Sequence, residues 1–176
     1  MSTNRTKPQT VRVVLQAGTF LAALLLMPVV HAESELPDWL EGPDWAHKAT
    51  EIHETEPLGK RAEFVRPLLM AHYEPVDYLI CGQVLGPLFS SKKEVHEIVA
   101  WQIIFASGDW VLQNPDQSKD IHAYTLAGLE SGLRTYKLIR EKKPRKVRTK
   151  MLEKLLERDE NGTLEQWVRE NPCKEA

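Results

Sequence analysis

Apolar side chains recur along most of this chain at steps of three and four residues, which is the spacing of one face of an α-helix. No stretch shows the strict alternation of apolar and polar residues that is typical of a half-buried strand. Prolines interrupt the helical pattern at Pro57, Pro67, Pro75, Pro87, Pro115, Pro144 and Pro172. We therefore predict an all-α fold, a compact bundle of about five to seven helices around a buried central helix.

The segment 94–113 is the candidate for that central helix. From Ile98 to Phe105 it is apolar on nearly every side, as expected for a helix surrounded by others. Ser91-Lys92-Lys93-Glu94 matches an S-x-x-E capping box at its start, and Pro115 would end it. Its candidate core residues are Val95, Ile98, Trp101, Phe105 and Leu112.

The segment 118–142 predicts a second long helix with one apolar stripe. On a neighbouring face Gly128 and Gly132 are four residues apart, a spacing that predicts close packing against another helix of the same chain. The same reasoning applies to Gly82 and Gly86 in the apolar segment 76–89. The stripe consists of Leu126, Leu129, Leu133 and Tyr136.

Two short helices are predicted near the C-terminus. The first ends near Arg158, where Gly162 suits the left-handed position after a helix. The second begins at Thr163, and Gln166 would complete a T-x-x-Q capping box.

The N-terminus has the three parts of a secretory signal peptide. Basic residues occur only before position 13, an unbroken apolar run covers 20–27, and Val30-His31-Ala32 ends the segment with small residues. We expect cleavage after Ala32, the alternative being an uncleaved anchor. The predicted organisation is a signal peptide over 1–32, an acidic arm with tryptophans over 33–57 and a helical domain over 58–176.

Charge adds information on localisation and partners. The whole chain has 23 Lys and Arg against 25 Asp and Glu, and the signal peptide contains three of the basic residues and no acid, so the mature net charge would be −5. An acidic exported protein is a poor candidate for nucleic-acid binding. The exception is the basic segment 137–150, either a contact surface for an acidic partner or a solvated helix end. Its candidate contact residues are Lys142, Lys143, Arg145, Lys146 and Arg148.

The chain has two cysteines, Cys81 and Cys173. In the oxidising compartment that a signal peptide predicts, such a pair is expected to form one disulfide; two free thiols are the alternative. The apolar setting of Cys81 favours an inert sulfur over a reactive one.

The tripeptide Pro-Asp-Trp occurs twice, at 37–39 and 43–45. Asp is a favoured N-cap, so each copy is expected to begin a helical turn and bring Trp39 or Trp45 onto the protein body. The first turn would cover 38–41 and end at Gly42, and the second would begin a helix that runs to about Glu54. Both tryptophans are candidates for a partner contact.

The same segment contains the strongest candidate for a metal site. His47, Glu51 and Glu54 follow the spacing i, i+4 and i+7, which places one imidazole and two carboxylates on one helix face. Exposed helices often carry such a face without a metal, so we predict no metal ligands and no cofactor. Zinc-protease, nucleophile-elbow, phosphate-loop and C-x-x-C patterns do not occur in the sequence.

Cys81, the stretch "AYTLAGLESGL" and the terminal "NPC" resemble features of small periplasmic helical proteins, such as acid-stress chaperones and immunity proteins of toxin secretion systems. This resemblance favours binding over catalysis. We therefore predict an exported, periplasmic, non-enzymatic binding protein, a soluble monomer or small homo-oligomer, whose partner is a protein or another envelope component. The alternatives are a carrier of a small apolar ligand and an enzyme with a cleft of histidines and acids.

Overall fold

The computed structural model describes residues 37–79, 81–143 and 147–173, and throughout these ranges the regular secondary structure is helical. The all-α prediction is confirmed. The predicted signal peptide and its predicted cleavage site after Ala32 lie outside the described residues, as do Arg145 and Lys146. In chain order the elements are η1 (Asp38–Leu40), α1 (Trp45–Thr55), α2 (Lys60–Tyr73), α3 (Gly82–Phe89), α4 (Glu94–Gln113), η2 (Pro115–Gln117), α5 (Ile121–Lys142), α6 (Lys150–Glu160) and α7 (Leu164–Glu170).

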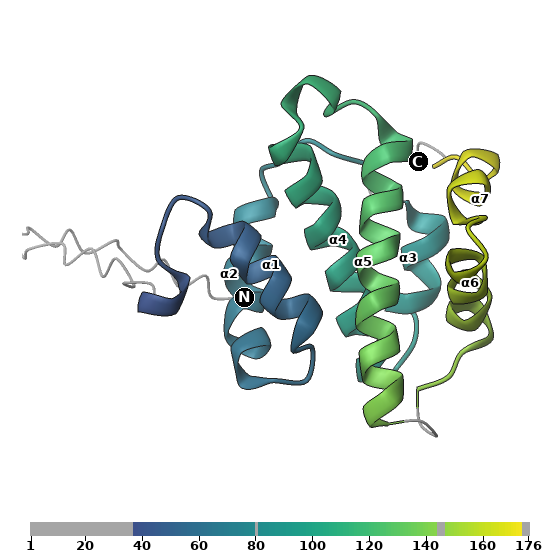
Figure 1. Ribbon diagram of the computed structural model, residues 1–176, viewed down its shortest axis with the longest axis horizontal. Helices are drawn as coiled ribbons and strands as arrows, with labels where there is room; N and C mark the ends of the chain where they lie inside the picture. Colours follow the sequence, from purple (N-terminus) through teal and green to yellow (C-terminus); the bar gives the residue numbers. More distant parts are fainter. Residues whose placement is uncertain (1–36, 80, 144–146, 174–176) are drawn as a thin grey trace, which may run out of the picture. The chain divides into compact units, whose positions relative to one another are not determined.

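Helix α4 is the centre of the domain and contacts α1, α2, α3 and α5 (Figure 1). Val99, Ala100 and Phe105 are completely buried, which confirms the predicted central helix. Leu112 was expected in the core but its exposed fraction is 47%, because Val111 takes the core position in that turn. A step of one residue turns the helix by about 100°, so the next side chain faces outward.

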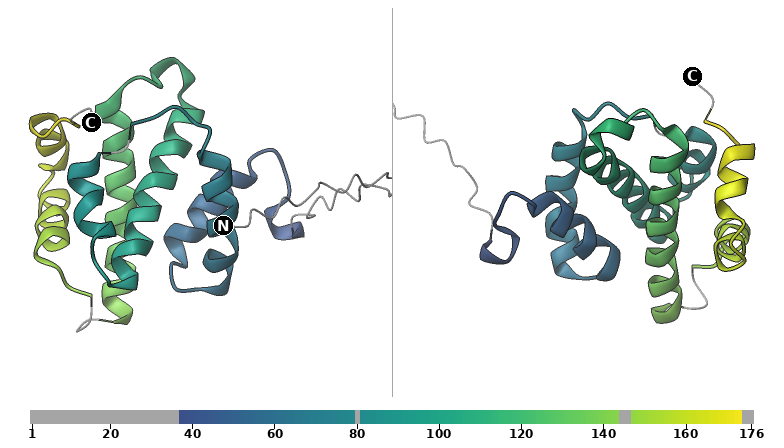
Figure 2. Two further views of the ribbon diagram at one scale, coloured as in Figure 1. Left: turned by 180° about the vertical axis from the view of Figure 1, so that it is seen from behind. Right: turned by 45° about the horizontal axis from the view of Figure 1, so that its top comes forward.

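Helix α5 lies against α4 along most of its length, as all views show (Figures 1 and 2). A Cβ at Gly128 would lie 2.6 Å from the carbonyl oxygen of Ile103, and one at Gly132 would also meet the Ile103 side chain. The predicted close packing is therefore confirmed for this pair. It is wrong for Gly82 and Gly86, since a Cβ at either position of α3 would meet nothing within 4 Å.

Both Pro-Asp-Trp copies begin helical turns, but not by the expected capping bond. Asp38 lies inside η1, and the carboxylate of Asp44, although at the N-cap of α1, pairs with Lys48 at 3.0 Å. Gly42 ends the first turn with a positive φ of 117°. Helix α1 contacts α2, α4 and α5 and belongs to the same compact unit as the helices that follow it.

Of the other predicted capping signals, the glycine ending of α6 forms and the two capping boxes do not. Gly162 has a φ of 67°, and the amides of Gly162 and Thr163 bond to the carbonyls of Asp159 and Arg158, which is a complete Schellman ending for α6. Neither predicted capping box forms: Ser91 Oγ accepts from the Lys93 amide before α4 begins, and the Thr163 hydroxyl bonds backward to the Arg158 carbonyl.

The predicted disulfide joins Cys81, just before α3, to Cys173, just after α7, with 4.9 Å between the Cα atoms. Thr125 of α5 lies against both sulfurs, with its hydroxyl 3.6 Å from Cys81 Sγ and 3.7 Å from Cys173 Sγ. The C-terminal helices are therefore linked covalently to the middle of the chain.

Candidate functional site

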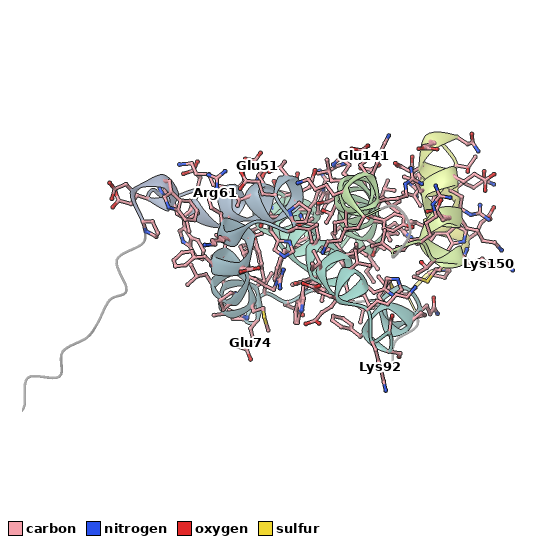
Figure 3. All side chains as sticks on the ribbon, turned by 90° about the horizontal axis from the view of Figure 1, so that it is seen from below. Glu51, Arg61, Glu74, Lys92, Glu141 and Lys150 are labelled. Atoms are coloured by element: carbon pink, nitrogen blue, oxygen red, sulfur yellow. A yellow bond between two sulfur atoms is a disulfide. The ribbon has the colours of Figure 1, made fainter. Side chains whose placement is uncertain are left out.

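Two open grooves lie beside α4. The polar groove, about 650 Å³, is formed by α1, α4 and α5, and the apolar groove, about 710 Å³, by α2, α3 and α4. Glu51 lines the first and Glu74 borders the second; their side chains point to opposite sides of the domain in Figure 3. Each groove therefore offers a separate surface.

The polar groove contains a hydrogen-bonded cluster around Asp109 of α4. The Oδ2 atom of Asp109 lies 2.8 Å from His47 Nδ1 and 2.8 Å from Gln113 Nε2, and these two nitrogens are themselves 2.6 Å apart. The other oxygen, Oδ1, accepts from the Tyr73 hydroxyl at 3.2 Å. Asp109 thus holds His47 through Nδ1 and leaves its second ring nitrogen, Nε2, directed toward Glu51 at 3.5 Å.

The neighbouring carboxylates change the protonation of His47. The hydrogen bond to Asp109 raises its pKa above the ordinary value, and the negative charges of Asp109, Glu51 and Asp44 act in the same direction, while partial burial opposes them. The imidazole therefore gains a proton at a higher pH than an ordinary histidine does. Burial raises the pKa of Tyr73, which remains a neutral donor behind Asp109.

A second polar chain begins in the same groove and crosses the domain interior. Arg134 of α5 makes a two-point ion pair with Glu54 of α1, at 2.6 and 3.0 Å. The Ser131 hydroxyl also donates to Glu54, at 2.5 Å, and accepts from Gln102 Nε2 at 2.7 Å. The Oε1 atom of Gln102 lies 2.6 Å from His53 Nδ1. Five side chains thus connect the groove to the core.

The chain ends at His53, which is completely buried. Because Arg66 Nε donates to His53 Nε2 at 3.2 Å, that nitrogen is the acceptor and Nδ1 carries the proton that is donated to Gln102. Burial lowers the pKa of His53 to about 4, so the ring is neutral at physiological pH. Each side chain from Arg66 to Ser131 then donates to the next one along the chain, and Glu54 accepts the last hydrogen bond. This arrangement gives each buried polar group a partner.

The structure separates the three residues of the candidate metal site. His47 bonds to Asp109, while Glu54 is committed to Ser131 and Arg134. In the described ranges no group of three or more His, Cys, Asp or Glu side chains is arranged to hold a metal ion. The i, i+4, i+7 face therefore splits between two hydrogen-bond networks.

The two predicted tryptophan contacts have different environments. Trp39 has an exposed fraction of 40% and lines the polar groove, with Phe64 edge-on at 5.8 Å and the guanidinium of Arg61 at 5.6 Å from its ring. Trp45 is partly buried against His72 of α2, 4.9 Å between ring centroids. Trp39 is therefore the more exposed of the two tryptophans.

The basic segment is exposed where the structure describes it, at Lys142, Lys143 and Arg148. These residues lie at the end of α5 and before α6, and none of them lines either groove. The charge of Lys142 acts on Glu56 at the end of α1, and Glu56 pairs with Arg61 next to Trp39.

Sequence reasoning missed the residues that organise the polar groove, Asp109, Tyr73, Gln102 and Arg134. One signal was available: Gln102 is a polar residue within the apolar run of the central helix, and a buried amide requires partners. Apart from Gln113, four residues along α4 from Asp109, the side-chain partners of Gln102 and Asp109 come from α1, α2 and α5 and are between 29 and 62 residues away.

The fold and these grooves define a class: an all-α domain with one disulfide, a buried polar chain and an open groove of mixed charge. Comparisons with protein-family models, with curated proteins and with solved structures find no match for this chain. The resemblance to periplasmic helical proteins therefore stays a prediction. Among the described helices none is both long and apolar enough to span a membrane.

Proposed function

We propose that this chain is an exported, non-enzymatic binding protein that docks another protein of the cell envelope in the polar groove. The observation that carries the proposal is the combination of exposed Trp39 and exposed Glu51 at the border of one groove. Tryptophan is enriched at protein-binding surfaces, and a polar, solvent-accessible rim commonly surrounds such an aromatic contact. The Cys81–Cys173 disulfide supports export, because such bonds persist in oxidising compartments.

The polar groups in this groove favour recognition over catalysis because most of them satisfy one another. Glu54 is held by Arg134 and Ser131, and Asp109 by Tyr73, His47 and Gln113. A general base needs a free lone pair aimed at a substrate proton. The lone pair of His47 Nε2 instead faces the Glu51 carboxylate, whose charge favours the protonated ring.

Photo-crosslinking in the producing cell tests the docking proposal. A crosslinking amino acid replaces Thr55, an exposed residue that lines the polar groove and is not a proposed contact, and, as a matched control, Glu74 at the opposite groove. We expect a discrete crosslinked protein from position 55, and the purified partner should bind at least tenfold more weakly to Trp39→Ala. Crosslinks only from position 74, or unchanged affinity in Trp39→Ala, would exclude the polar groove as the docking site.

A second candidate function, carriage of a small apolar ligand, is favoured by the apolar groove. Phe89, Met70 and Trp101 line it, and the first two are exposed large apolar side chains. Its volume is in the range of small-molecule sites, although such sites usually enclose the ligand. Native mass spectrometry of gently purified protein tests this: a reproducible added mass that is lost in Trp101→Ala supports the carrier, and a bare chain mass contradicts it.

A further inference from the structure

His47 and Glu51 present two hydrogen-bond acceptors to the same space. The Asp109 carboxylate can only accept, so Nδ1 of His47 donates to it, and Gln113 Nε2, 2.6 Å from that ring nitrogen, donates to Asp109 as well. Nε2 of the neutral ring then carries a lone pair and lies 3.5 Å from Glu51 Oε1. Two facing acceptors repel each other unless a positively polarised hydrogen lies between them. That hydrogen can be a proton on Nε2 or the N–H of a guest.

The cations of this chain that border the polar groove are already paired. Arg134 is bound by Glu54, and Lys48 pairs with Asp44 at 3.0 Å. Glu51 is exposed, with 66% of its side chain accessible, and its ionic contact among the described residues is His47. The charged groups that act on His47 are all carboxylates: Glu51 in α1, Asp44 at the N-cap of α1 and Asp109 in α4. The neutral Tyr73 hydroxyl of α2 lies behind Asp109 and donates to it.

We propose that His47 Nε2 and the Glu51 carboxylate together accept N–H groups from a guanidinium, carried by an arginine of the docked protein. This inference rests on the docking function proposed above and names the chemistry of the partner. A guanidinium offers several N–H donors in a planar fork and therefore matches two neighbouring acceptors better than a lysine ammonium. It also stacks on aromatic rings, and Trp39 and Trp110 line the same groove.

The chain itself shows that Trp39 accepts this kind of contact, since the Arg61 guanidinium lies 5.6 Å from the centre of its ring. Arg61 is held by Glu56 rather than by the groove carboxylates. In the existing contact, a guanidinium lies against the Trp39 ring while a carboxylate, Glu56, accepts its N–H groups. A guest arginine would make the same kind of contact, with Glu51 as the carboxylate.

Protonation of His47 competes with the guest. An imidazolium places its own hydrogen between Nε2 and Glu51, which removes one acceptor and cancels the local negative charge. Binding is therefore strongest when His47 is neutral and weakens at lower pH. The affinity should fall by about fivefold as the pH drops through the pKa of the free site and then level off, because Glu51 still accepts from the guest.

A small probe tests the chemistry separately from the partner. N-acetyl-arginine methylamide is titrated into the full mature chain while the indole N–H signals of Trp39 and Trp110 are followed by NMR, and the citrulline compound, uncharged and similar in shape, is the matched ligand control. We expect saturable shifts with the arginine compound and weaker, unsaturated shifts with citrulline. Glu51→Gln should weaken binding about fivefold, a size typical of an exposed pair.

Two variants complete the test. His47→Gln keeps a donor for Asp109 and cannot titrate, so its binding should lose the pH dependence; Glu74→Gln, on the opposite groove, should bind as the original chain does. Equal binding of the two compounds, or no effect of Glu51→Gln, overturns the arginine inference. Docking itself stands if position 55 still crosslinks its partner, and it fails without that crosslink whatever the probe shows.

Discussion

The α-carbon of Gly128 in α5 lies so close to the Ile103 carbonyl of α4 that a Cβ would approach this oxygen to 2.6 Å. The two longest helices therefore meet backbone to backbone at this point. The Ser107 side chain fills the space beside Gly128 and donates to the Tyr124 carbonyl at 3.0 Å. The position of α5, which supplies Ser131 and Arg134 to the polar groove, depends on this close approach.

Replacing Gly128 by alanine should destabilise the fold, although the same change elsewhere in a helix usually stabilises it. We expect a loss of about 1–3 kcal/mol in the free energy of unfolding, because the added methyl meets a backbone atom that cannot move alone. Urea denaturation measures it. The control is Gly82→Ala in α3, where the added Cβ meets nothing within 4 Å; equal effects at the two sites would contradict the packing argument.

Acid should destabilise the protein through His53. Its pKa is about 4 in the folded chain against an ordinary 6.5, so between these values the unfolded chain binds a proton that the folded chain does not. The contribution is complete above about pH 6.5 and is lost as the pH falls toward 4, a decrease of about 3 kcal/mol. Urea denaturation at pH 7 and pH 4 measures this difference.

His53→Asn keeps a side-chain donor for Gln102 and should flatten that acid dependence. His47 provides the opposite sign, because its raised pKa contributes stability below the unfolded value that is lost as the pH rises through the folded value. An acid dependence that is unchanged in His53→Asn would show that carboxylates alone produce it.

Gln102 should contribute more to stability than its single amide suggests. Gln102→Leu would leave His53 Nδ1–H without its acceptor and Ser131 Oγ without its donor, both in the buried interior. We expect a cost of about 2–4 kcal/mol, since each unsatisfied buried group costs about 1–3 kcal/mol. Gln83→Leu, the same change at an exposed position of α3, is the control and should have little effect in the same denaturation experiment.

The disulfide should stabilise the fold by restricting the unfolded chain. It joins residues 92 positions apart, and removing it by a double Cys81→Ser, Cys173→Ser change should cost about 2–5 kcal/mol. Chemical denaturation with and without a reducing agent measures the loss. Reductant should act on the original chain only; an equal response of the double variant would indicate an unrelated effect.

Export should leave a shortened chain. Expressed in a cell with a secretory pathway, the protein should appear outside the cytoplasm with a mass that begins at Glu33 and is two hydrogens lighter than the reduced chain. Intact-mass spectrometry of the cell fractions checks both expectations together. A full-length mass in the membrane fraction would favour the uncleaved anchor instead.

The sequence by itself determined the helical class, the central helix and the disulfide pair. Each of these is written locally, in the period of apolar residues or in the number of cysteines. The four-residue glycine spacing predicted close helix packing correctly at Gly128 and Gly132 and wrongly at Gly82 and Gly86. The sequence also placed the turns of both Pro-Asp-Trp copies. The prediction that each Asp caps its turn was wrong. Asp38 lies inside η1, and the Asp44 carboxylate pairs with Lys48, four residues further along α1, instead of with a backbone amide.

The tertiary structure alone decided which polar residues meet. His47, Glu51 and Glu54 share one face of α1. His47 nevertheless bonds to Asp109 of α4 and Glu54 to Arg134 of α5, because the two helices contact different turns of α1. The same neighbours decide that Gly128 is crowded and Gly82 is free. Helical spacing specifies a direction around one axis; a binding groove arises only where other helices supply the opposing wall.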